Sequence, residues 1–155
     1  LLVVLHPPMM KRTRWIVIGM MATLSACDKL TAISDVPEIS FESVVPNVVT
    51  AYQDSLYFTI SYRDGDGDLG QNNTDENNLF VQDSRNQVTY GFRIQQLSPD
   101  NATIAIQGNL NVTLPNTAII NGGASESVSY TIWVVDRAGN ESNRVSSSTV
   151  TVNSQ

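Results

Sequence analysis

The sequence predicts an all-β domain, an antiparallel β-sandwich of about seven or eight strands. Hydrophobic residues alternate with polar ones in several short runs, and a period of two is typical of half-buried strands. Turn signals rich in Pro, Asn, Asp, Ser and Gly separate these runs, and no window of a dozen residues has a convincing helical period. Short strands at this spacing, with turns between them, indicate an antiparallel sandwich.

Six runs carry the alternation. In chain order they are 56–62, 79–81, 88–94, 104–114, 128–134 and 150–152. The run 56–62 is the clearest, because Leu56, Phe58 and Ile60 alternate with polar or amphipathic residues. Turns are expected at 46–47, 98–101, 121–123 and 138–140, where Pro, Gly, Asn and Asp gather.

The first segment of the chain has the order of a secretory signal. Residues 11–14 (Lys-Arg-Thr-Arg) are mostly basic, residues 15–24 are largely apolar, and Leu24-Ser-Ala-Cys27 follows. The apolar run is too short for a membrane-spanning helix, which needs about 20 apolar residues. We therefore expect residues 1–26 to be an upstream extension and a signal peptide, with the first eight residues belonging to an over-extended reading frame.

Leu24-Ser-Ala-Cys27 resembles the lipobox of bacterial lipoproteins. This resemblance implies cleavage before Cys27 and diacylation of its sulfur, so that residues 27–37 form a lipidated tether and residues 38–155 form the sandwich domain. Lipid chains contribute about 0.8 kcal/mol per buried methylene and would hold the protein on a membrane of the bacterial cell envelope, with the outer membrane as the expected location. The other interpretation is a buried or chance cysteine behind an ordinary secretory signal.

Charge and residue counts exclude several classes of function. Three of the nine basic residues precede residue 15, which leaves six basic and 15 acidic residues in the rest of the chain. No basic cluster follows Lys29, so we expect no nucleic-acid partner. The only histidine is His6 and the only cysteine is Cys27, which excludes a Ser-His-Asp triad and a His/Cys zinc site from the body of the chain. Its acids cluster on one loop instead of flanking a cleft, so we expect no enzyme.

One loop carries a motif that suits a metal ion. Directly after the run 56–62 and Arg63 comes Asp64-Gly-Asp66-Gly-Asp68-Leu-Gly. Three carboxylates at alternating positions repel one another, and the glycines let the backbone curl so that these carboxylates converge on a cation. Calcium accepts about six to eight oxygens in flexible geometry, whereas magnesium demands tighter octahedral geometry, so we predict calcium as the cofactor.

The same loop resembles the calcium loops of EF-hand-like and dockerin-like repeats. This resemblance implies a further carboxylate at position twelve, which is Asp75 when Asp64 is position one. Leu69 stands at position six, where those loops have glycine, and Gly70 follows one place late. The alternative is a solvated, metal-free acidic turn, because Asp and Gly are common in turns.

Residues 128–153 resemble the last hairpin of bacterial immunoglobulin-like and fibronectin-type modules, in which a strand ends in Asp-x-Ala-Gly-Asn, here 136–140. The resemblance implies an immunoglobulin-like sandwich, although the cysteine pair of antibody domains is absent. In that strand order the acidic loop and this hairpin share one end, where Asp136 or Glu141 would complete the shell of ligands. Otherwise Asp136 accepts hydrogen bonds within its own turn.

These features together predict a non-catalytic binding or adhesion module, lipid-anchored in the cell envelope and stabilised by calcium in the 64–75 loop. Its ligand would be a protein or a glycan that the sequence does not identify. The alternative is a carbohydrate-binding accessory lipoprotein that uses Tyr57, Tyr90 or Trp133 as a platform for sugars. Each of these rings has a simpler interpretation as core or cross-strand packing.

Overall fold

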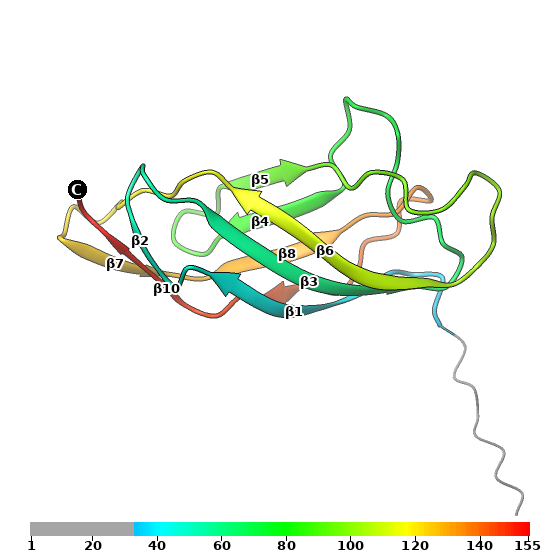
Figure 1. Ribbon diagram of the computed structural model, residues 1–155, viewed down its shortest axis with the longest axis horizontal. Helices are drawn as coiled ribbons and strands as arrows, with labels where there is room; N and C mark the ends of the chain where they lie inside the picture. Colours follow the sequence, from blue (N-terminus) through cyan, green and yellow to red (C-terminus); the bar gives the residue numbers. More distant parts are fainter. Residues whose placement is uncertain (1–32) are drawn as a thin grey trace, which may run out of the picture. The chain divides into compact units, whose positions relative to one another are not determined.

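The computed structural model describes residues 33–155, and this part of the chain is all β (Figure 1). The strands are β1 (Glu38–Val45), β2 (Val48–Thr50), β3 (Leu56–Asp64), β4 (Leu79–Asp83), β5 (Thr89–Phe92), β6 (Ile106–Leu114), β7 (Ser125–Val128), β8 (Tyr130–Val134), β9 (Val145–Ser146) and β10 (Val150–Asn153). Among the described residues, no helix is long and apolar enough to cross a membrane. The expected signal peptide and Cys27 lie outside the described residues.

The strands form three sheets with the orders β1-β3-β6, β5-β4-β8-β9 and β2-β10-β7. The pairings within them are antiparallel, apart from the short parallel pairing of β2 with β10. In Figure 1 the sheet of β1, β3 and β6 lies in a different layer from β4, β5 and β8. The predicted all-β class with antiparallel sheets is therefore confirmed, and the layers are sandwich-like.

Two strands of the fold are interrupted. Only Ser129 separates β7 from β8, and residues 147–149 separate β9 from β10. Because β8 pairs with β9 and β7 pairs with β10, both halves belong to one hairpin. At the break, Tyr130 N donates to Ser147 Oγ at 2.9 Å, and Ser147 N donates to Tyr130 O at 2.8 Å. These interruptions explain why ten segments occur where seven or eight strands were predicted.

The core forms between the layers from the alternating residues of the strands. Leu56, Phe58 and Ile60 of β3 are fully buried, whereas Tyr57 between them is 54% exposed. The Phe58 ring meets the Tyr130 ring edge to face, with centroids 5.2 Å apart. Since β3 and β8 belong to different sheets, this contact shows that the two sheets pack face to face.

A buried ion-pair network holds the connection between β6 and β7 to the end of β4. The Arg85 guanidinium donates to Asp83 (Nη2 to Oδ2, 2.6 Å) and to Glu126 (Nη1 to Oε2, 3.0 Å), and the exposed fractions of the Arg85 and Asp83 side chains are 9% and 2%. It also donates to Thr117 Oγ1 at 3.1 Å and to Ala118 O at 2.9 Å. One arginine therefore fixes a loop that has no regular structure of its own.

Candidate metal centre

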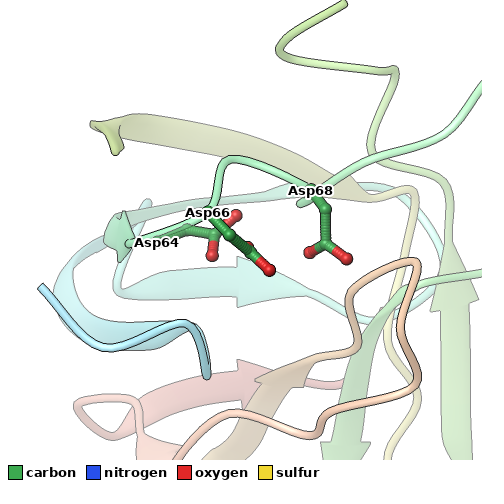
Figure 2. A group of neighbouring side chains, drawn as sticks. All are labelled: Asp64, Asp66 and Asp68. Atoms are coloured by element: carbon green, nitrogen blue, oxygen red, sulfur yellow. The ribbon is translucent and has the colours of Figure 1, made fainter. Parts of the chain in front are cut away.

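Asp64, Asp66 and Asp68 lie together where β3 ends (Figure 2). Asp64 is the last residue of β3, and residues 65–68 form the turn that follows it. One carboxylate oxygen from each of the three residues lies within 4.8 Å of the other two. The predicted convergence of these side chains is confirmed, and we call the three residues the acidic cluster.

Each member of the acidic cluster has one buried oxygen, Oδ1, without a hydrogen-bond partner. Asp64 and Asp68 use their second oxygen to accept a backbone N–H, from Leu69 at 2.8 Å and from Ala138 at 3.0 Å. Asp66 accepts a hydrogen bond from no N–H or hydroxyl group of residues 33–155. Buried polar atoms without partners are rare in native proteins, and an ion at the site is one of the physical reasons for them.

The electrostatics of the acidic cluster favour a cation. Burial raises the pKa of Asp64 to about 6, and the charges of Asp66 and Asp68 act in the same direction. Burial also raises the pKa of Asp68, with Asp136 and Asp66 as its negative neighbours. Without a cation, ionisation of all three carboxylates is therefore unfavourable at neutral pH. A divalent ion would instead stabilise the ionised form of each carboxylate.

The loop that carries the acidic cluster is packed rather than loose. A Cβ added at any of its three glycines would lie 2.3 Å from a backbone carbonyl oxygen of another segment. Gly67 and Gly70 also have positive φ angles of 75° and 83°, which favour glycine. The three contacts are Gly65 with Ile33, Gly67 with Ile104 and Gly70 with Gln95. This packing argues against a solvated, unstructured turn.

Leu69 accounts for the departure from the EF-hand pattern. Its side chain is fully buried in the core, and its N–H donates to Asp64. The sixth position of this loop therefore serves core packing, while Gly67 and Gly70 make the turns on either side of it. The resemblance to EF-hand loops is limited to the alternating carboxylates.

The other two predicted ligands lie outside the acidic cluster. Asp75 is exposed, and the hydroxyl of Thr74 donates to it at 3.4 Å. Asp136 is buried, but its two carboxylate oxygens accept hydrogen bonds from the backbone N (2.7 Å) and the side-chain Nδ2 (2.9 Å) of Asn140. Asp136 therefore stabilises its own turn and is close enough to raise the pKa of Asp68.

The hairpin after β8 meets the acidic loop, as the strand order led us to expect. Arg137 donates its backbone N–H to Asp68 O at 3.3 Å and its guanidinium to Gly70 O at 2.8 Å. From a third segment, the Ser98 hydroxyl donates to Gly67 O. The sequence did not indicate that Arg137 and Ser98 would hold the acidic loop. The one indication for Arg137 was the expectation that the 136–140 turn lies at the same end of the fold as this loop.

The aromatic residues considered as a platform for sugars differ in exposure. Trp133 is only 8% exposed, because it stacks on Phe80 with centroids 5.3 Å apart and Arg144 lies 4.0 Å from its ring centroid. Tyr90 is partly buried against the core, and Tyr57 is exposed on β3. The largest of the three rings therefore has little accessible surface for a sugar.

Residues 33–155 thus define an all-β protein with a buried acidic cluster that could hold a metal ion. Comparison with protein-family models, curated proteins and solved structures finds no significant match to this chain.

Proposed function

We propose that the chain is a lipid-anchored module of the bacterial cell envelope, with an immunoglobulin-like fold and one structural calcium ion in the acidic cluster. Two observations on the acidic cluster carry the proposal: one carboxylate oxygen from each residue lies within 4.8 Å of the other two, and each residue has a buried Oδ1 without a hydrogen-bond partner among residues 33–155. Calcium takes oxygen ligands at about 2.3–2.6 Å and tolerates irregular geometry, so it would give these oxygens a partner and neutralise their repulsion. A donor set of carboxylates favours it over zinc or copper.

The strand order supports the immunoglobulin-like part of the proposal. The sheet β1-β3-β6 has the order of the A, B and E strands of such sandwiches, and β4, β8 and β9 have the order of C, F and G. The strand β5 pairs with β4 rather than with β6, so it extends the second sheet instead of the first.

The burial of the cluster supports a structural role for the ion. Metal sites that act on a substrate keep an accessible coordination position. Here the three free oxygens are buried, and the loop is covered by segments that contain Ile33, Ser98 and Ala138. An ion at this site would fix the loops around it and occupy the three buried oxygens of the cluster, which favours a structural role in a binding module over catalysis.

The position of the acidic cluster also separates an anchored end from a binding end. Cys27 lies six residues before Ile33, a distance of about 20 Å at most when the chain is extended. The opposite end of the strands, around β2 in Figure 1, presents Tyr52 with 65% of its surface exposed. Tyr52 and Ile119 line a hollow of about 250 Å³ there, which would be the surface offered to a protein or glycan partner.

Calcium titration tests the ion. In metal-stripped protein we expect calorimetry to give heat with a Kd on the order of 10⁻⁴ M, as in extracellular modules. Calcium at a hundred times that Kd stabilises the folded state by about 2.7 kcal/mol, which corresponds to a rise in Tm of about 10 °C. Magnesium at the same concentration should give a smaller rise. An unchanged Tm in 10 mM calcium would remove the ion from the proposal.

Fractionation of bacteria that express the chain tests the anchor. We expect the wild-type protein in the membrane fraction, with a mass that shows acyl chains on Cys27, and the Cys27→Ser variant in the soluble fraction. The reason is that acyl chains supply the membrane affinity of an otherwise acidic domain. If Cys27→Ser stays in the membrane fraction, the anchor is not a lipid on this residue.

A further inference from the structure

We infer that the calcium ion also fastens residues 33–36, the segment that leads into the domain, so that occupancy of the acidic cluster determines whether this segment is held against the domain. The inference rests on the proposed function, because it assigns a regulatory effect to the same site. Its starting point is a single hydrogen bond, in which Gly65 N donates to Ser34 O at 2.7 Å. Gly65 lies between Asp64 and Asp66, so the segment is attached to the turn that the ion would hold.

The contact at Gly65 is close enough to depend on the exact position of the turn. A Cβ at Gly65 would lie 2.3 Å from Ile33 O and 2.6 Å from Ser34 O. The backbone of the entering segment therefore lies directly against the Gly65 Cα. Any displacement of the acidic loop must move this segment or break its contact.

The entering segment has little else to hold it. Within residues 33–155, its one backbone hydrogen bond to a strand or loop is the bond from Gly65, and Val36 N bonds only to the Ser34 hydroxyl. A hollow of about 510 Å³ lies beside it, and Val36 is 45% exposed. Firm attachment begins with β1, where Glu38 pairs with Arg63 and the N and O of Ile39 both bond to the Asn143 side chain at 2.8 Å.

These contacts make the segment a two-state element. With calcium bound, the carboxylates are held together, Gly65 is fixed and Ser34 stays bonded to it. Without calcium, the like charges of Asp64, Asp66 and Asp68 repel one another, and the turn opens away from Ser34. The four released residues 33–36 span about 14 Å when extended.

Backbone NMR of the ¹⁵N-labelled full chain tests this inference directly. We expect order parameters of about 0.85 at Ser34, Asp35 and Val36 in 10 mM calcium, and values below 0.6 in EGTA. Ile39 should stay rigid in both conditions, because the Asn143 side chain holds it. Order parameters at residues 34–36 that do not change, in a protein that calorimetry shows to bind calcium, would overturn the inference and leave the proposed ion in place. Absence of calcium heat would instead overturn the proposed function.

The Gly65→Ala variant tests whether the contact of Gly65 with residues 33 and 34 couples calcium binding to the ordering of residues 33–36. Its added Cβ pushes away Ile33 and Ser34, while Asp64, Asp66 and Asp68 keep their side chains. At a calcium concentration that calorimetry on the variant shows to be saturating, we expect residues 34–36 to be as mobile as in EGTA. The dispersed β-sheet resonances of the variant check that it folds. Calcium-dependent ordering of residues 34–36 in spite of the added Cβ would show that Gly65 is not the attachment point.

Discussion

The Asp66→Asn variant is expected to be more stable than the wild type in EGTA and to gain almost no stability from calcium. In EGTA the substitution removes one of three like charges, and each lost repulsion relieves on the order of 1 to 4 kcal/mol. In calcium at a hundred times Kd, the wild type gains about 2.7 kcal/mol that the variant cannot gain. Asp66 suits the test because no N–H or hydroxyl group of the described chain depends on it.

Urea unfolding of both proteins, each in EGTA and in calcium, measures how much unfolding free energy each protein gains from calcium. Asp75→Asn is the matched control, because Asp75 is acidic and close in sequence but exposed and outside the acidic cluster. The control should keep the full response to calcium. A response reduced as much in Asp75→Asn as in Asp66→Asn would make Asp75 the fourth carboxylate ligand. A gain of stability from calcium as large in Asp66→Asn as in the wild type would show that Asp66 holds no ion.

The Arg85→Met variant is expected to lose about 3 to 5 kcal/mol of unfolding free energy. Removing one partner of a buried ion pair leaves the other charge uncompensated. Here the orphaned charge is Asp83, whose side chain is 2% exposed, and Glu126 loses a partner as well. The methionine keeps much of the arginine stem, so the loss reports the guanidinium rather than a cavity.

The free energy of unfolding in urea checks the Arg85 prediction. Arg63→Met is the control, since Arg63 forms an exposed pair with Glu38 at 3.9 Å and should change stability by less than about 1 kcal/mol. Combining Arg85→Met with Asp83→Asn should recover part of the loss, because the buried charge disappears. A cost for Arg85→Met no larger than that for Arg63→Met would mean that the network contributes little to stability.

The sequence was sufficient to predict the strands in which hydrophobic and polar residues alternate without a break and one face packs against the core. The run 56–62 became β3 (Leu56–Asp64), and the run 104–114 became β6 (Ile106–Leu114). In both, hydrophobic side chains point inward at every second position, so periodicity and burial coincide. The predicted run 128–134 crosses an interruption at Ser129, where a side chain replaces a bond of the ladder.

Three strands had no usable sequence signal. The alternation of β1 (Glu38–Val45) breaks at a bulge between Phe41 and Ser43, so that Val44 rather than Ser43 is buried. The strands β2 and β9 have only three and two residues, too few to show a period. These strands form because an adjacent strand supplies backbone hydrogen bonds. The local sequence does not reveal which strand will be adjacent.

The candidate site also has a part that the sequence could predict and a part that it could not. Convergence of Asp64, Asp66 and Asp68 follows from local chain geometry. The three residues lie within five consecutive positions, and the two glycines between them allow a tight turn that brings the carboxylates together. The fate of Asp75 could not follow from it, since the chain beyond Gly70 is set by contacts with Gln95 and with Arg137. Long-range partners of this kind need the tertiary structure.

The burial of the three Oδ1 atoms would affect how fast a bound ion exchanges with solvent as well as how tightly it binds. An ion bound through the three buried Oδ1 atoms would exchange most readily when the loop opens, and opening separates Gly67 from Ile104 and from the Ser98 hydroxyl. Exchange of the ion with solvent is then limited by local unfolding instead of diffusion. The protein would therefore keep its calcium through rapid dilution or brief exposure to a chelator, and give it up on the timescale of amide exchange in this loop.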